Sequence, residues 1–196
     1  MSSVFSTPLL TPLLRVLAGA ALKIAGWKIS LRDVPAPPFI LIGAPHTSNW
    51  DFPLMLCTVL HLGHEARWLG KTSLFTPPFG PLMRWLGGIP VNRDQSQNAV
   101  AVTAQALRQN PGLILCVAPE GTRRKVQRWR TGFYYIALAA EVPIVMLAID
   151  ADACEVCHLG QYRPTGDVEA EIPEIQRRYR GFGGIIPENA FELQDQ

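Results

Sequence analysis

Short apolar runs alternate with helix-like patterns over most of the chain. Apolar runs of strand length cover residues 39–43, 67–69, 88–91, 113–118 and 142–149. Between them, segments of helix length cover residues 49–60, 96–109 and 131–140. Strands separated by helix-length segments need crossover connections, which join parallel strands. The pattern therefore predicts an α/β fold: a single domain with a largely parallel central sheet flanked by helices. Beyond residue 150 it weakens to a short strand and a helix around residues 172–179.

The N-terminal region has a different pattern. Between residues 9 and 26, polar or small positions recur every three or four residues, on one stripe of an amphipathic helix. These positions are Thr11, Arg15, Gly19, Lys23 and Gly26. The wide apolar face has two open interpretations, because it suits both a helix in a lipid interface and a helix that covers the domain's own core. We expect residues 1–33 to contain this helix and residues 34–196 to form the domain.

Length and composition set the class of protein. The chain has 196 residues, of which 48% are hydrophobic and 17% charged, and this is typical of one globular domain with a single core. No stretch of eighteen uncharged apolar residues occurs. We therefore expect no membrane-spanning helix.

The charges are unevenly distributed along the chain. Residues 1–149 carry 14 Lys and Arg against 6 Asp and Glu, whereas residues 150–196 carry 4 against 10. Five cations gather at Arg123, Arg124, Lys125, Arg128 and Arg130. An anionic ligand suits this part of the chain. Nucleic acid does not, because aromatic residues do not alternate with the cations and the acidic C-terminal quarter would repel a polyanion.

The four cysteines point to a reducing compartment. They are too few for a disulfide scaffold in a chain of this length, and the first 30 residues lack the order of a secretory signal. Cys154, Cys157 and His158 match the spacing for covalent haem attachment, but that attachment requires export. We therefore expect no haem and no metal. We also expect a cytosolic protein whose mature chain begins where the sequence begins.

A histidine and an aspartate follow the strand predicted at residues 39–43. His46 and Asp51 are five positions apart, so they cannot meet within one regular helix. They can meet if His46 lies in a loop and Asp51 in the first turn of a helix capped by Ser48 or Asn49. The carboxylate would then orient the imidazole as a general base. The alternative is a capping aspartate beside an incidental histidine.

Two other segments carry groups that suit phosphate. Glu120, Gly121, Thr122 and Arg123 follow the predicted strand 113–118, which brings them to the same sheet edge as His46. The planar guanidinium of an arginine can bind two phosphate oxygens at once. Residues 88–93 end in Arg93, whose alternative role is a surface pair with the neighbouring aspartate.

In their order along the chain, these segments resemble the glycerolipid acyltransferase superfamily. His46 and Asp51 match its HxxxxD motif, residues 88–93 its second block, residues 120–123 its EGTR motif and residues 142–146 its fourth block. The resemblance covers residues 39–150. Four ordered matches are much more specific than any one of them.

The resemblance implies an enzyme that transfers a fatty acyl group from a thioester to a lipid alcohol. The donor would be acyl-CoA or acyl carrier protein, with no other cofactor, and the acceptor a lysophospholipid such as 1-acylglycerol-3-phosphate, in phospholipid synthesis. His46 would act as general base and Asp51 would stabilise its imidazolium. Backbone N–H groups at the start of the following helix are our candidates for the oxyanion site. No covalent acyl-enzyme is required.

In similar proteins the second and third motifs hold the acceptor. Carried over to this chain, Arg93, Glu120, Gly121, Thr122 and Arg123 would hold the acceptor, with the two arginines on its phosphate. Lys71 is a further candidate for phosphate contact. The resemblance also favours the lipid interpretation of the N-terminal helix, which places the protein at the cytoplasmic face of a membrane as a peripheral or monotopic protein.

Some positions depart from the family pattern. Arg124 stands where relatives frequently have a small hydroxyl residue, Asn92 where many have aspartate, and Met146 where a second proline is common. Two alternatives therefore remain: a phosphate-free hydroxylated lipid as acceptor, or a lipid- or phosphate-binding module without catalysis.

Overall fold

A seven-stranded sheet forms the centre of the computed structural model, which describes residues 3–91 and 96–192. Within the described residues, the strands are β1 (Lys28–Ser30), β2 (Phe39–Ala44), β3 (Glu65–Lys71), β4 (Gly88–Val91), β5 (Leu113–Val117), β6 (Ile144–Asp150) and β7 (Glu155–Tyr162). Their order in the sheet is β1-β7-β6-β2-β5-β3-β4. All neighbouring pairs are parallel except β6 and β7.

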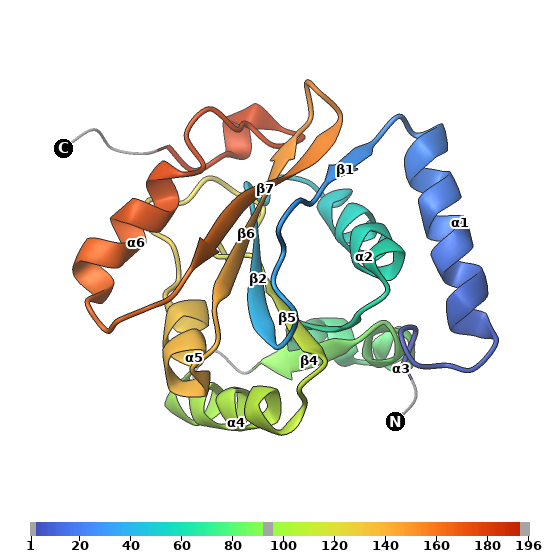
Figure 1. The fold of residues 1–196 in the computed structure, drawn as a ribbon, viewed down its shortest axis with the longest axis horizontal. Coiled ribbons are helices and arrows are strands. Elements are labelled where there is room, and N and C mark those ends of the chain that lie inside the picture. Colours follow the sequence, from blue (N-terminus) through green and yellow to red (C-terminus); the bar gives the residue numbers. More distant parts are fainter. Residues whose placement is uncertain (1–2, 92–95, 193–196) are drawn as a thin grey trace.

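Helices cover both faces of this sheet, as Figure 1 shows. One face is covered by α1 (Leu10–Ile24) and α2 (Asp51–Leu62), and the other by α4 (Ser96–Gln109), α5 (Gly132–Ala140) and α6 (Val168–Arg177). Short helices η1 (Thr72–Phe75) and α3 (Gly80–Trp85) connect β3 to β4, and η3 (Pro187–Asn189) lies near the C-terminus. The predicted α/β class with a largely parallel sheet is confirmed.

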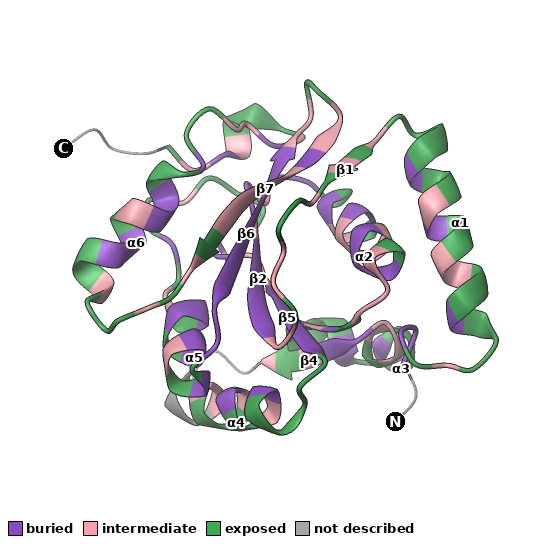
Figure 2. Cartoon of the chain, in the orientation of Figure 1, coloured by how far each residue is buried: buried purple, intermediate pink, exposed green. Residues whose placement is uncertain are grey.

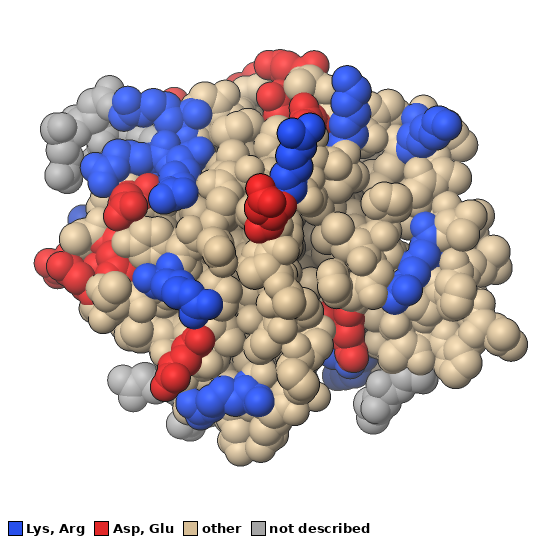
Figure 3. All heavy atoms as spheres, in the orientation of Figure 1, with Lys and Arg blue, Asp and Glu red and all other residues tan. Residues whose placement is uncertain are grey.

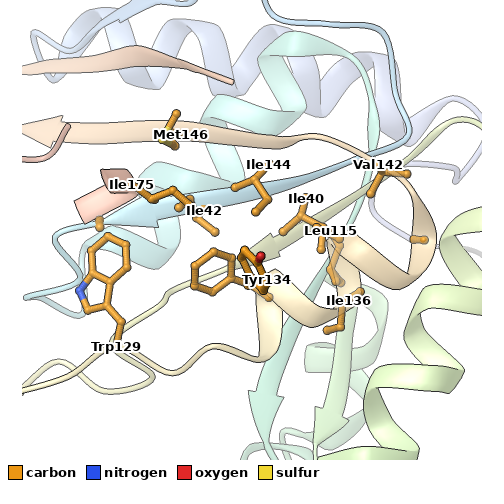
Figure 4. Close-up of a cluster of buried hydrophobic side chains, with 14 of the residues drawn as sticks. Ile40, Ile42, Leu115, Trp129, Tyr134, Ile136, Val142, Ile144, Met146 and Ile175 are labelled. Carbon is orange, nitrogen blue, oxygen red and sulfur yellow. The ribbon is translucent and has the colours of Figure 1, made fainter. Parts of the chain in front are cut away.

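The core consists of two clusters separated by the sheet. Strands β2, β5 and β6 are buried on both faces, which explains why they read as continuous apolar runs (Figure 2). On the α5 and α6 side, Ile40, Ile42 and Ile144 pack against Tyr134 (Figure 4). Full burial of each such aliphatic side chain contributes about 1.5–3 kcal/mol to stability. The cluster therefore stabilises the central strands, from whose ends the loops after β2 and β5 start.

The register of the central strands aligns the ends that carry the motifs. Ile42 of β2 lies beside Val117 of β5 on one side and Met146 of β6 on the other. The loops after β2, β5 and β3 therefore leave the same edge of the sheet. This edge is where open α/β folds bind their ligands.

Helix α1 packs one side against the body of the protein and exposes the other. Thr11, Ala18 and Leu22 are buried against the body of the protein, and the Arg15 Nη2 donates a 2.7 Å hydrogen bond to the Gly63 carbonyl. The opposite side of the helix is exposed and apolar, with Leu9, Leu10, Leu13, Val16, Leu17 and Ile24 open to solvent. In the described residues, no helix has both the length and the apolar content that a membrane crossing requires.

Two elements differ from the expectation. Strand β1 is not signalled by the sequence pattern, and β7 is longer than the short strand predicted there. Strand β1 is a short edge strand without a buried residue, and its neighbour β7 is mostly half-buried, with Val156 as its one buried residue, so the apolar signal of both strands is weak.

Candidate active site

The loop after β2 holds an imidazole against a buried carboxylate. His46 Nδ1 lies 2.9 Å from Asp51 Oδ2, and the two side chains are 20% and 5% exposed. A carboxylate accepts, so Nδ1 carries the hydrogen and Nε2 is left as the basic nitrogen. The pairing that the sequence predicted between these two residues is therefore present.

Asp51 also organises the loop itself. Its Oδ2 accepts hydrogen bonds from the backbone N–H groups of Thr47 at 2.7 Å and Ser48 at 2.8 Å. The expected cap at Ser48 or Asn49 is wrong, because α2 starts at Asp51, after Trp50, and no side chain caps it. The aspartate instead reaches back to the preceding turn. The N–H groups of Thr47 and Ser48 thus already donate hydrogen bonds to Asp51, which removes them as candidates for an oxyanion site.

A C-terminal segment anchors the same loop. The Ile186 N–H donates to Thr47 Oγ1 at 3.1 Å, and Asn189 Nδ2 donates to the Thr47 carbonyl at 3.2 Å. Gly184 has a φ of +67°, and a Cβ atom there would lie 2.8 Å from Thr47 Oγ1, so glycine is required for this close approach. The sequence carries no local signal for the contact, because more than a hundred residues separate the partners.

Glu120 is turned under the loop. Its side chain is buried, and Oε1 accepts a 3.1 Å hydrogen bond from the His46 backbone N–H. Burial raises the pKa of Glu120 to about 7, against the lowering effect of the hydrogen bonds from its own and the His46 backbone. The structure therefore joins the first and third motifs through a carboxylate that supports His46.

The other residues of the third motif lie on the loop that follows Glu120. Gly121 has a φ of +64°, and a Cβ atom there would lie 2.9 Å from Arg130 Cδ, so the glycine makes room for that side chain. Thr122 is half-buried, and its Oγ1 accepts from the Arg124 N–H at 3.4 Å. Arg123 is exposed. It stands three residues from the carboxylate that touches His46, at the same edge of the sheet.

Lys71 and Arg93 complete the predicted set. Lys71 is the last residue of β3, is exposed, and lies beside Val91 in the sheet register. Because β3 neighbours β5, Lys71 leaves the sheet at the same edge as Glu120. Arg93 lies outside the described residues.

A buried tryptophan anchors the basic loop, residues 123–130, which carries the five clustered cations. Trp129 is only 6% exposed, and its ring packs against Tyr179 and Phe191 at centroid distances of 5.4 and 5.8 Å. Tyr179 in turn donates a 3.2 Å hydrogen bond to the Ile42 carbonyl of β2. These contacts bring the basic loop beside the end of α6, where Lys and Arg side chains gather at the upper left of Figure 3. In the sequence, the one indication of this anchor is a tryptophan within a run of cations.

No cluster of three metal-binding side chains occurs in the described part of the chain. All four cysteines are free, and His158 Nδ1 lies 2.6 Å from the Arg32 carbonyl.

The raised pKa of Glu120 makes stability depend on pH. The carboxyl ionises more readily in the unfolded chain, so the folded state loses stability as pH rises from about 4.5 through about 7. The loss approaches about 3 kcal/mol, the free energy equivalent of this pKa difference. In urea unfolding from pH 5 to 8, Glu120→Gln should not show this decline, and the exposed Glu169→Gln should behave like wild type. A difference between wild type and Glu120→Gln that stays constant with pH would contradict the assignment.

Comparisons with known proteins agree with the geometry. The family model "Acyltransferase" matches residues 29–150, which include both the His46 and the Glu120 motifs. The chain is 28% identical over 126 residues to the chloroplastic 1-acyl-sn-glycerol-3-phosphate acyltransferase BAT2 of Brassica napus, a match that covers 62% of this chain and 35% of that protein. The chain thus spans about a third of the length of this curated relative.

A solved structure has the same fold. The 1-acyl-sn-glycerophosphate acyltransferase PlsC from Thermotoga maritima superposes with a TM-score of 0.60 at 18% identity, over 86% of this chain and 76% of that one. With a matching family model over more than half its length and the motif residues in place, the chain belongs to the acyltransferase family.

Proposed function

We propose that this protein transfers a fatty acyl group from the thioester of acyl-CoA or acyl carrier protein to the hydroxyl of a lysophospholipid such as 1-acylglycerol-3-phosphate. The observation that carries the proposal is the 2.9 Å pair of His46 and Asp51 with Nε2 left as a base, in a chain of the acyltransferase family. A module that only binds lipid has no need of an oriented base.

The reaction follows from the chemistry of this pair. His46 Nε2 removes the proton of the acceptor hydroxyl while the hydroxyl oxygen attacks the carbonyl carbon of the thioester. When the tetrahedral intermediate collapses, the carbon–sulfur bond breaks, and the imidazolium returns the proton to the thiolate. The products are an ester and a free thiol. Asp51 stabilises the imidazolium, and its bonds to Thr47 and Ser48 keep it from rotating away.

Exposed cations at the same end of the sheet as this base suit the phosphate of the acceptor. Arg123 lies three residues after Glu120, whose carboxylate accepts a hydrogen bond from the His46 backbone N–H. Lys71 is the last residue of β3, the strand next to β5. In this proposal Arg123 holds the phosphate, with Lys71 and Arg93 as further contacts. Glu120 acts through His46 as a positioning residue, because its carboxylate is buried beneath the loop.

The outer face of α1 suits the surface of a membrane. Leu13, Val16 and Leu17 are 54%, 70% and 52% exposed, although they are large and apolar. Burial in a lipid interface removes this surface from water, and nearby cations add attraction to anionic head groups. We therefore place α1 on the cytoplasmic face of a membrane, as a peripheral or monotopic anchor.

Substitution of the base tests the enzyme. His46→Ala should lower turnover by about 10²–10⁴, the usual contribution of a general base, and leave lysophospholipid binding intact. Asp51→Asn should also lower turnover, while His64→Ala and Asp152→Asn serve as controls that change the same residue types elsewhere. The assay offers the purified protein labelled acyl-CoA and acyl carrier protein with a panel of acceptors, and identifies the product by mass. Turnover that survives in His46→Ala would overturn the mechanism.

Substitution of Arg123 tests the acceptor. Loss of a charged hydrogen bond to phosphate costs about 2 kcal/mol, so Arg123→Gln should lower kcat/KM for lysophosphatidate about thirtyfold. A phosphate-free hydroxylated acceptor should be unaffected, and Arg163→Gln should change neither. If the wild-type protein prefers phosphate-free acceptors, the phosphate role of Arg123 is wrong while that of His46 stands.

Vesicle flotation tests the anchor. The combined substitutions Leu13→Glu, Val16→Glu and Leu17→Glu should lower binding to phospholipid vesicles more than tenfold, because three apolar side chains no longer enter lipid. Val102→Glu, a similarly exposed position on α4, should bind like wild type. Circular dichroism checks that both variants keep their fold. Equal flotation of the two would refute the role of α1.

A further inference from the structure

A cavity lies away from His46, where α1, β1 and the end of α2 meet. Its volume is about 480 Å³, and its lining includes Gly19, Leu22, Lys23, Trp27, Lys28 and His61. His61 stands ten residues after Asp51 along α2, which places the cavity roughly 15 Å from the start of that helix. The proposed acyl transfer does not use any of these residues.

The backbone around this cavity is fixed by hydrogen bonds. After α1 the chain turns at Gly26, which has a φ of +77°, and the Trp27 N–H donates to the Leu22 carbonyl at 2.8 Å. The Lys28 N–H then donates to the Cys154 carbonyl at 2.8 Å as β1 joins the sheet. This turn sets Lys28 on the same cavity as Lys23 of the last helical turn.

The polar groups at the cavity favour an anion. Lys23, Lys28 and His61 line it, and no acidic residue does. Carbonyl oxygens at the end of α1 are already used, because Ala25, Gly26 and Trp27 donate to them. Glu155 is the acidic neighbour of Lys28 in the register of β1 and β7, and among the described residues no ion pair within 4 Å joins them.

The apolar part of the lining favours a lipid over a small free anion. Leu22 is buried and Trp27 half-buried, and an aromatic ring of this kind suits a membrane–water boundary. The adjacent surface of α1 is mostly apolar, with basic and no acidic side chains, on the right of Figure 3. Gly19 has no side chain, and a Cβ atom there would lie 3.1 Å from His61 Nδ1. The glycine thus keeps space open beside the histidine.

We propose that this cavity binds the phosphate of an anionic phospholipid head group. Lys23 and Lys28 contact the phosphate oxygens, His61 adds an N–H donor, and Leu22 and Trp27 contact the upper part of the lipid. The choice of a lipid over free phosphate rests on the proposed contact of α1 with a membrane. The site is distinct from the acceptor site, since His46 and Arg123 take no part in it.

Titration of the full chain with soluble short-chain lipids tests this site. The probes are dihexanoyl phosphatidylglycerol below its micelle concentration, dihexanoyl phosphatidylcholine and inorganic phosphate, each followed by the NMR signals of His61 and Trp27. Phosphatidylglycerol should shift both signals and bind at least tenfold more tightly than either other probe. His46→Ala should bind it like wild type, which separates this site from the proposed catalysis.

Three variants separate the cavity from surface charge in general. Lys23→Gln with Lys28→Gln should weaken phosphatidylglycerol binding at least tenfold, since each lysine contributes about fivefold. Gly19→Leu should weaken it similarly without changing the charge, because the new side chain fills the cavity. Arg108→Gln with Arg163→Gln removes the same charge elsewhere and should have no effect.

Specific outcomes overturn the inference. Equal binding of phosphatidylglycerol and phosphatidylcholine would show that the charges do not select the ligand. Inorganic phosphate as tight as phosphatidylglycerol would make this a free-anion site and refute the lipid assignment. Unchanged binding in Gly19→Leu would show that the lysines act from the surface and not through the cavity.

Discussion

One carboxylate oxygen holds the site together. Asp51 Oδ2 accepts from the Thr47 and Ser48 backbone and lies 2.9 Å from His46 Nδ1. Each hydrogen bond to this charged atom compensates for its removal from water. The same interaction that bends the loop therefore orients the base, so loop shape and imidazole orientation cannot change independently. This explains why the residues stand five apart: the chain must leave the strand, turn, and enter the helix before the carboxylate can reach back.

A second carboxylate connects this loop to the neighbouring strand. Glu120 accepts from the His46 N–H, and burial raises its pKa to about 7, so near neutral pH its charge is sensitive to small changes in its surroundings. Arg123, which follows on the same loop, is thereby tied to the position of His46. One hydrogen bond thus joins the loop of the candidate base to the loop that carries Arg123.

The parts of the structure that depend on local pattern could be predicted, and those that depend on distant contacts could not. Continuous apolar runs indicate β2, β5 and β6, because both faces of these strands are buried. The spacing of His46 and Asp51 at the end of a strand allows their pairing, and the ordered set of motifs favours it. The inward orientation of Glu120 could not be read from its motif, since composition does not say which side of a turn faces the core. The contact of Thr47 with Ile186 depends on chain segments that meet only in the folded protein.

The arrangement of the two faces bears on whether the cations of the basic loop bind the acceptor head group or the anionic surface of a membrane. Ala18 and Leu22 of α1 pack in the core cluster on one face of the sheet, whereas Trp129 of the basic loop packs in the cluster on the other. Figure 1 accordingly shows α1 and α6 at opposite sides of the molecule. A bilayer that lies flat against the outer face of α1 does not reach a loop beside α6. Within the proposed function, the cations around Arg123 therefore serve a substrate, and attraction to anionic lipid belongs to the lysines at the end of α1.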